Sequence, residues 1–355
     1  MVVVDDRTTA DEAYGLACQG VGLLWQGDFQ NARQMLTALA SRADRKSARA
    51  VKSGKAAVAA GSPAERFNLQ RQARSQRART LGMLLIRLEA DHGIALRRAP
   101  DLRQACREAY GPAQEASVVA LRELLGIVGA HEWRVRGIAI AAAGGRIHPH
   151  YGVFPPTRSE YVDLVARAPF PETGGSIDTA FDIGTGTGVL AAVLARRDIR
   201  CIVATDQDPR ALACARENVE RLGLAGRVEI VQADLFPPGR AGLVVCNPPW
   251  VPARPSSPLE HGIYDPESRM LRGFLAGLTA HLEPAGEGWL ILSDLAEHLG
   301  LRTRQQLLDW IESAGLKVVD RLDVRPAHPK ASDPNDPLHA ARRAEVTSLW
   351  RLAAR

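Results

Sequence analysis

The chain has 355 residues, of which 46% are hydrophobic and 24% charged, an ordinary globular composition with enough length for two domains. No run of 18 apolar residues occurs, and the N-terminus turns acidic after three valines, so we expect neither a membrane span nor a signal peptide. The scattered cysteines form no C-x-x-C pair and indicate a reducing, cytoplasmic location without a disulfide framework or a metal site. They are Cys18, Cys106, Cys201, Cys214 and Cys246.

The net charge of +5 is unevenly distributed. Between residues 42 and 79, only Asp44 and Glu65 oppose a concentration of basic residues. Such a patch attracts a phosphate backbone or an acidic partner, although a solvated helix face explains it equally well. The basic residues are Arg42, Arg45, Lys46, Arg49, Lys52, Lys55, Arg66, Arg71, Arg74, Arg77 and Arg79.

The N-terminal part of the chain is predicted to be helical. Apolar residues recur at three- and four-residue spacing in 81–88 and again in 117–128. Gly61-Ser62-Pro63 and Gly111-Pro112 interrupt this pattern. We therefore expect a basic helical domain for substrate recognition over residues 1–130.

A β-hairpin is predicted next. Apolar residues nearly alternate from Trp133 to Ile140, a turn is expected at 143–145, and residues 147–154 can return as a second strand. A helix is expected over 159–166. Residues 131–165 would thus form a hairpin linker and a connecting helix.

From about residue 178, expected strands and helices alternate, which indicates a mostly parallel α/β sheet covered on both faces. Asp208 as N-cap and Pro209 as the first helical residue mark one helix start. This sheet belongs to the catalytic domain that we expect over 166–355. Its strands are expected at 179–183, 200–205, 228–233, 242–246, 288–292, 317–324 and 344–352, and its helices near 187–197, 209–222, 267–282 and 303–314.

A glycine-rich run, Asp182-Ile183-Gly184-Thr185-Gly186-Thr187-Gly188, lies between the first of these strands and the first helix. Glycines there allow a tight turn and let a ligand approach the backbone beside a helix N-terminus. A dinucleotide fingerprint would require glycine or alanine at position 189, where this chain has Val189. The candidate cofactor-binding residues in this run are Asp182, Gly184, Thr185, Gly186 and Gly188, with Asp182 expected to order the loop.

Two carboxylates follow at the ends of the next two expected strands. Asp206 lies 22 residues after Gly184, where its oxygens can accept both ribose hydroxyls of a nucleoside. Asp234 precedes Leu235 at the end of the third strand. Since ligands bind outside the carboxyl ends of strands in such sheets, we expect all of these residues at one site.

The fourth strand ends in Asn247-Pro248-Pro249-Trp250. The Asn247 side chain and the Pro248 carbonyl can each accept a hydrogen bond from one N–H of a planar –NH2 group. The two prolines fix φ, so these acceptors are held stiffly, and Trp250 offers a face for stacking. We expect these four residues to form the transfer site.

The combination of glycine run, strand-end aspartates and Asn-Pro-Pro-Trp resembles the class I S-adenosylmethionine-dependent N-methyltransferases of the methyltransferase small-domain type. These include the release-factor glutamine methyltransferases and the enzymes that methylate exocyclic amines of rRNA bases. The resemblance covers roughly residues 178–352 and more loosely reaches back to about 131. It implies a Rossmann-like seven-stranded sheet, S-adenosylmethionine as cofactor, Asn247 close to that cofactor, and Asp234 facing its adenine amino group.

Two departures separate this chain from the release-factor group. The aromatic residue is Trp250, where that group usually carries tyrosine, and the N-terminal region is nearly twice as long. The domain layout favours a protein glutamine amide as acceptor, whereas the basic stretch 42–79 suits an RNA base amine. A non-catalytic adaptor with a methyltransferase fold is the remote alternative, which the complete set of site residues argues against. A nicotinamide oxidoreductase is disfavoured by Val189.

Two further segments could border the site. Arg158 and Glu160 follow the hairpin and either line the substrate entrance or are ordinary surface charges. The segment 252–269, which contains His261, is expected to form a loop over the active site.

Overall fold

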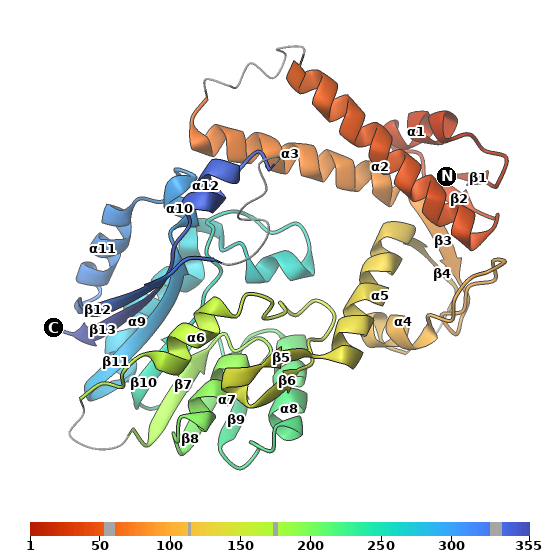
Figure 1. Cartoon of the computed structure of the whole chain (residues 1–355). Coiled ribbons are helices and arrows are strands. Elements are labelled where there is room, and N and C mark those ends of the chain that lie inside the picture. The colour runs from red at the N-terminus through yellow and green to blue at the C-terminus, as the bar shows by residue number, and fades with distance from the viewer. Residues whose placement is uncertain (53–60, 113–114, 173–176, 327–335) are drawn as a thin grey trace. The chain divides into compact units, whose positions relative to one another are not determined.

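The computed structural model describes residues 1–52, 61–112, 115–172, 177–326 and 336–355. The chain forms two compact units, Met1–Glu132 and Trp133–Arg355 (Figure 1). Within the described ranges, no helix combines the length and the apolar character needed to cross a membrane.

The first unit contains a four-stranded sheet, so the prediction of an entirely helical N-terminal domain is wrong. The strand order is β1-β2-β3-β4, with the first three strands parallel and β4 antiparallel to β3. The strands are β1 (Val2–Val4), β2 (Leu23–Trp25), β3 (Leu84–Leu88) and β4 (Ser117–Ala120). The helices are α1 (Ala10–Cys18), α2 (Phe29–Lys52), α3 (Pro63–Gly82), α4 (Arg103–Tyr110) and α5 (Leu121–Arg136).

The error has a physical cause in segment 81–88. Leu84, Ile86 and Leu88 are fully buried and alternate with more exposed neighbours, which is the period of a strand. Together with Leu81 and Leu88, the consecutive leucines at 84 and 85 also fit a helical spacing, and so short a run cannot distinguish the period of a strand from that of a helix.

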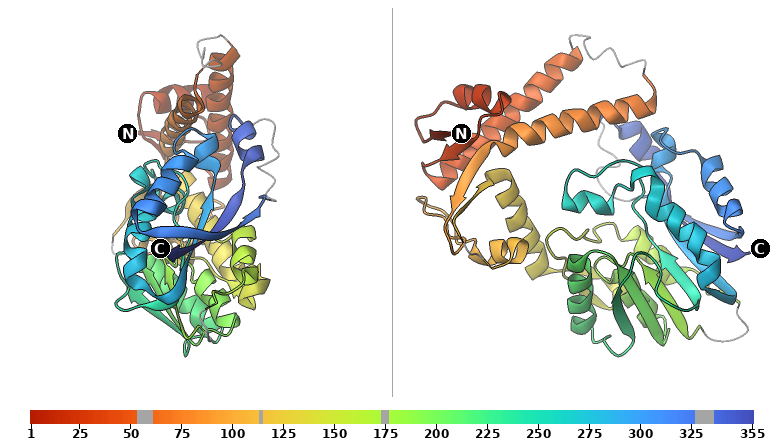
Figure 2. Two further views of the ribbon diagram at one scale, coloured as in Figure 1. Left: turned by 90° about the vertical axis from the view of Figure 1, so that its left-hand side faces the viewer. Right: turned by 180° about the vertical axis from the view of Figure 1, so that it is seen from behind.

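The two long helices α2 and α3 contact each other (Figure 2), and Arg77 on α3 pairs with Asp44 on α2 at 2.7 Å.

The second unit is built on a seven-stranded, mostly parallel sheet, as predicted. The strand order, which was not predicted, is β12-β13-β11-β10-β7-β8-β9. All neighbouring pairs are parallel except those of β13, which runs antiparallel to β11 and β12. The strands are β7 (Thr179–Ile183), β8 (Cys201–Asp206), β9 (Val228–Gln232), β10 (Ala241–Cys246), β11 (Leu282–Ser293), β12 (Leu316–Val324) and β13 (Thr347–Ala354). The helices are α6 (Glu160–Arg167), α7 (Val189–Arg196), α8 (Pro209–Arg221), α9 (Arg269–His281), α10 (Leu295–His298), α11 (Arg304–Ser313) and α12 (His339–Ala344).

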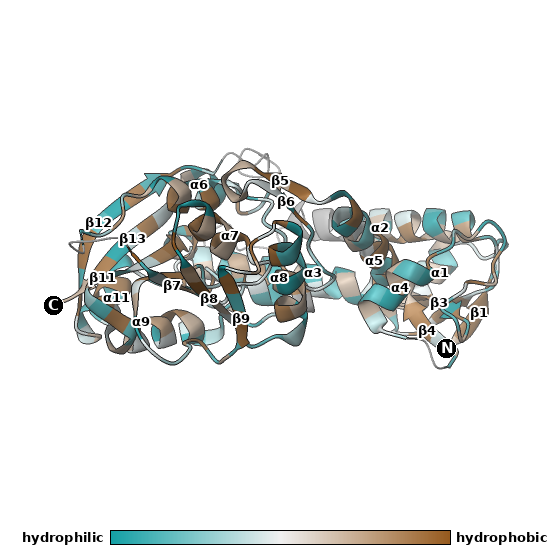
Figure 3. Cartoon of the chain, turned by 90° about the horizontal axis from the view of Figure 1, so that it is seen from below, coloured by the Kyte–Doolittle hydropathy of each residue, from teal (hydrophilic) through white to brown (hydrophobic). Residues whose placement is uncertain are grey.

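Both faces of the sheet are buried along its central strand β10. On β10, Leu243 and Val245 pack into a core with α6, α7 and α8, whereas Val244 and Cys246 face a second core with α9 and α11. Strands buried on both sides are continuously apolar, as the brown colour of the central strands shows (Figure 3). This apolar continuity explains why their positions could be predicted closely from the sequence.

The predicted hairpin exists but is shorter than expected. Its strands are β5 (Ile138–Ile140) and β6 (Gly145–Ile147), and they pair antiparallel around Gly144, whose φ is +72°. Trp133 and Val135 belong to α5 and are exposed, so their alternation did not mark a sheet face. The return strand ends at Ile147, which frees the residues that follow it for the cavity described next.

Candidate active site

The glycine run forms the turn between β7 and α7. Gly184, Gly186 and Gly188 all have positive φ, at +71°, +55° and +80°. An added Cβ at Gly184 would overlap the terminal methyl of Met270, whereas one at Gly186 would have no heavy atom within 4 Å. Glycine is therefore favoured here by backbone conformation at all three positions, whereas the overlap at Gly184 involves the flexible end of the Met270 side chain, which can move.

Asp182 holds this turn in place. Its side chain is buried, and its Oδ2 accepts hydrogen bonds from Thr185 Oγ1 at 2.7 Å and from the Ala191 backbone N–H at 3.0 Å. Burial raises the pKa of the Asp182 carboxyl to about 6. Asp182 was predicted to bind the cofactor, but it is not among the described residues that line the cavity. Its two hydrogen bonds order the loop instead.

Asp206 is the last residue of β8 and lines the cavity. Its Oδ2 accepts from the Gly186 N–H and its Oδ1 from the Asp208 N–H, both at 3.0 Å. Burial raises the pKa of this carboxyl, and the backbone hydrogen bonds oppose that rise. Each oxygen has a second acceptor site left for a ligand hydroxyl.

Asp234 and Leu235 also line the cavity, just beyond the end of β9. Asp234 Oδ2 pairs with Arg269 Nη2 at 2.9 Å, and both side chains are exposed. Leu235 has a φ of +80°, and its carbonyl accepts a hydrogen bond from Thr205 Oγ1. Its side chain packs against α9, because an added Cβ at Gly273 would lie 2.7 Å from Leu235 Cδ1.

The Asn-Pro-Pro-Trp segment follows the buried strand β10. Asn247 and Pro249 line the same cavity as Asp206 and the glycine turn. Pro248 and Trp250 do not belong to the described lining. The Trp250 indole N–H instead donates to Asn247 Oδ1 at 2.9 Å, a contact that the sequence did not indicate.

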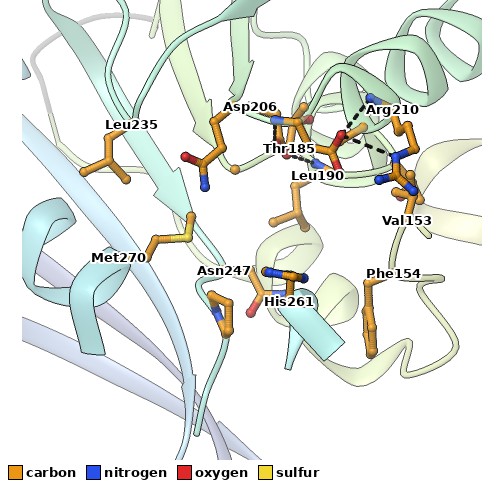
Figure 4. Close-up of a pocket in the computed structure, with 18 of the residues that line it drawn as sticks. Val153, Phe154, Thr185, Leu190, Asp206, Arg210, Leu235, Asn247, His261 and Met270 are labelled. Atoms are coloured by element: carbon orange, nitrogen blue, oxygen red, sulfur yellow. Dashed lines mark hydrogen bonds and ion pairs between the residues drawn. The ribbon is translucent and has the colours of Figure 1, made fainter. Parts of the chain in front are cut away.

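The cavity has a volume of about 500 Å³ and opens at the carboxyl ends of the central strands. Figure 4 shows Thr185 of the glycine turn and Asp206 at the end of β8 facing it, Met270 and Leu235 on another side, and Asn247 beside His261. Several lining residues were not singled out from the sequence as site residues, among them Val153, Phe154, Leu190, Arg210, His261 and Met270. They come from loops and helix starts without a motif, so only the folded chain brings them together.

The segment after Trp250 reaches this cavity, as expected for a loop over the site. A bridge between Val251 and Tyr264 closes the loop, and His261 lies between these two residues and contributes to the lining. Asp265 ends the loop by accepting from the Met270 and Leu271 N–H groups at 3.0 and 3.1 Å, which caps α9.

Comparison with known proteins finds a family model that matches the part of the chain containing this cavity. Residues 147–300 match the family model described as methyltransferase small domain. The chain is 34% identical over 176 residues to a release factor glutamine methyltransferase of Cereibacter sphaeroides, covering 43% of this chain and 61% of that protein. It is 49% identical over 71 residues to a ribosomal protein L11 methyltransferase of Pelotomaculum thermopropionicum, covering 19% of this chain and 23% of that protein.

A third relative is a tRNA1(Val) (adenine(37)-N6)-methyltransferase of Shewanella loihica, 27% identical over 187 residues, covering 50% of this chain and 72% of that protein. The first two matches span less than two thirds of the length of those relatives. The match to the family model contains the glycine turn, both strand-end aspartates and the Asn-Pro-Pro-Trp segment. The similarity to this family therefore extends over residues 147–300 of the chain.

Proposed function

We propose that the chain is an S-adenosylmethionine-dependent N-methyltransferase that methylates a planar amide or amino nitrogen of a macromolecule. The observation that carries the proposal is that Asn247 and Pro249 line one cavity together with Gly184, Gly186 and Asp206. A hydrogen-bond acceptor for an –NH2 group thus lies in the space that a nucleoside cofactor would enter.

The cavity residues fit that cofactor. A volume of about 500 Å³ lies within the range typical of cofactor pockets. Gly186 leaves the backbone open to a ligand, and Asp206 offers lone pairs to ribose hydroxyls. Leu235 and Met270 supply apolar surface for a base. When bound, S-adenosylmethionine would supply an electrophilic methyl group on a positively charged sulfur.

The chain's own contribution at the acceptor is orientation. The lone pair of an amide nitrogen is delocalised into the carbonyl group, so the nitrogen is a poor nucleophile. Holding both of its hydrogens favours rehybridisation of the nitrogen, which takes the lone pair out of conjugation and directs it at the methyl group. Asn247 Oδ1 can hold one hydrogen and the Pro248 carbonyl the other, while the prolines keep the segment rigid. Rate gain by such positioning is large when the reacting groups are fixed close to the reactive geometry.

We infer that the acceptor is the side-chain amide of a protein glutamine. Among the relatives, those from Cereibacter sphaeroides and Moorella thermoacetica are named release factor glutamine methyltransferases, and the latter is 37% identical over 144 residues. The basic stretch 42–79 supports RNA less than its composition suggests, because Arg42 pairs with Asp11 and Arg77 with Asp44, each at 2.7 Å. The side chains of Lys46, Arg49 and Lys52, together with residue Lys55, lie outside the described part of the chain.

An RNA base amine is the second candidate. Arg45, Arg66, Arg74 and Arg79 are exposed, and three of them lie on α3, where they present positive charge to solvent. Exposed arginines of this kind would contact phosphates without reading base sequence. The tRNA methyltransferase among the relatives keeps this alternative open for a direct test.

The full chain should be incubated with methyl-labelled S-adenosylmethionine and either release factors or total RNA. We expect label in the protein fraction, and none when Asn247 is replaced by alanine. Transfer to RNA alone would overturn the glutamine assignment. Cofactor binding without transfer to either would support the adaptor alternative.

The exposed arginines of α3 provide a second test with its own control. If RNA is the substrate, the triple variant R66Q/R74Q/R79Q should weaken RNA binding and flatten its log–log salt dependence by up to about 3 units. If the substrate is protein, RNA should not compete with methylation at low salt. The triple variant should in either case leave cofactor affinity unchanged.

A further inference from the structure

The hydrogen bond from the Trp250 indole to Asn247 determines how the Asn247 carboxamide is oriented. A carboxamide has an accepting end, Oδ1, and a donating end, Nδ2, which a rotation of 180° exchanges. The indole N–H can only donate, so its 2.9 Å contact requires that Oδ1 face Trp250. Asn247 is then locked in the orientation that exposes an acceptor.

This orientation matters for a planar –NH2 substrate. Such a group has two N–H donors. If Nδ2 took the place of Oδ1, a donor would face these donors and no hydrogen bond could form. A carboxamide oxygen has two lone pairs, so Oδ1 can accept from Trp250 and from the substrate at the same time. We propose, on the basis of the proposed function, that Trp250 is a positioning residue that fixes the Asn247 carboxamide, and that an Arg158–Glu345 pair holds the Trp250 ring in place.

The ring is held from outside the cavity. The Arg158 guanidinium lies 5.6 Å from the centroid of the Trp250 ring, within the range of a cation–π contact. Arg158 Nη1 also pairs with Glu345 Oε1 at 2.8 Å, and the Glu345 side chain is fully buried. A buried carboxylate that neutralises Arg158 fixes the guanidinium over the ring.

Glu345 is itself anchored to the sheet. Its Oε1 accepts from Ser293 Oγ at 2.7 Å, and Ser293 is the last residue of β11. The Val346 N–H next to it donates to Asp294 Oδ1 at 2.7 Å. The support for Trp250 therefore comes from the segment before α6, the end of β11 and the segment before β13, which are far apart in the sequence.

The identity of the aromatic residue is decisive in this arrangement. Phenylalanine has no polar hydrogen, and tyrosine carries its hydroxyl at the far end of the ring, so neither can donate from the position of the indole N–H. A tryptophan that served packing alone would tolerate phenylalanine at a cost in stability only. Trp250 does contact apolar residues of both cores, so the two roles must be separated by experiment.

The first test reads the hydrogen bond without activity. The chain has six tryptophans, and in a ¹⁵N-labelled sample the indole signal that disappears in Trp250→Phe belongs to Trp250. We expect Asn247→Ala to move this signal and to speed its exchange with solvent. An unchanged Trp250 signal in Asn247→Ala would overturn the positioning role, whether or not the protein transfers methyl groups.

The second test reads catalysis. Trp250→Phe should lower kcat about tenfold, a typical loss for one hydrogen bond, with cofactor affinity unchanged. Glu345→Ala should lower kcat by a similar factor, and Glu345→Gln, which keeps an acceptor for Arg158 and Ser293, should recover most of it. Full activity in both Trp250→Phe and Glu345→Ala would refute the proposal.

A matched control is available on α11. Trp310 lies 5.6 Å from the Arg272 guanidinium, the same ring-to-cation distance as in the Trp250 pair. The structure gives Trp310 no bond to Asn247, so Trp310→Phe should leave kcat unchanged. If the wild-type chain shows the expected indole signal but methylates no acceptor, the proposed function fails while the Trp250–Asn247 bond stands.

Discussion

Two parts of the same sheet each contain a buried carboxylate, but only one of these carboxylates has a cationic partner among the described residues. On β11, both oxygens of Glu287 are bonded by Arg351, to Nε and Nη2 at 2.8 Å each, and Oε2 also accepts from the Trp289 indole at 3.1 Å. On β7, Asp182 has no cationic partner among the described residues, and its Oδ1 has no hydrogen bond there. Burial accordingly raises the pKa of Asp182 to about 6.

The difference indicates that one carboxylate serves stability, whereas the other lies in the region of the cavity. The antiparallel edge contains a neutralised ion pair, which costs little to bury once its geometry is complete. The parallel half keeps incompletely satisfied carboxylates at the strand ends, where Asp206 lines the cavity. Sites of this kind sacrifice stability for a binding surface, and perturbed carboxyls cluster there.

The largest effect should come from breaking the ion pair. Glu287→Ala would remove both short hydrogen bonds of the buried Arg351 and leave Asp320, at 3.7 Å, as its neighbouring carboxylate, and we expect it to lower the free energy of unfolding of the second unit by about 3 kcal/mol. Denaturant titration followed by tryptophan fluorescence would measure the loss. Cofactor affinity of the folded fraction should not change.

The double variant Glu287→Leu with Arg351→Met provides the control for this pair. It removes both charges and should recover much of the lost stability, because no charge remains buried alone. If Glu287→Ala costs less than about 1 kcal/mol, the pair is not the structural anchor assigned to it.

The next effect concerns Asp182 and the pH. Its pKa is raised from 3.8 to about 6, so the folded state binds the proton more tightly than the unfolded state. Stability should therefore fall as the pH rises from about 4 to about 6, by about 3 kcal/mol, and stay level above that range. Asp182→Asn keeps an oxygen for Thr185 and Ala191 and should remove this slope. An equal slope in the variant would assign it to another group.

The second unit was predicted well because its signals are local. Continuous apolar strands and the Asp208-Pro209 helix start identify elements without knowledge of the fold. The prediction for the first unit was wrong at strands of three to five residues, because such short strands contain too few positions to show the two-residue alternation of a strand. Contacts between distant segments gave no sequence signal at all. Arg158 and Glu345 are 187 positions apart, and nothing in either segment indicates the other.

A smaller effect is expected at Asp206. Asp206→Ala removes the carboxylate that faces the cavity, and S-adenosylmethionine affinity should fall by about 1.5–3 kcal/mol through loss of charge-assisted hydrogen bonds. Titration calorimetry would measure it. Unchanged affinity would exclude Asp206 from the cofactor site. The parallel part of the sheet would then have no carboxylate with a demonstrated binding role to compare with the Glu287–Arg351 pair.

The smallest effect sharpens the comparison within one turn. Asp208, two residues after Asp206, accepts from the Arg210 N–H at 2.9 Å and caps α8. Asp208→Ala should lower the free energy of unfolding by about 1 kcal/mol, the usual value of an N-cap. It should change cofactor affinity by less than about twofold, because its backbone N–H still donates to Asp206 Oδ1. Thermal unfolding and calorimetry on the same sample would separate the two quantities. An affinity loss as large as that of Asp206→Ala would mean that Asp208 itself binds the cofactor, and the division between a capping and a binding carboxylate in this turn would fail.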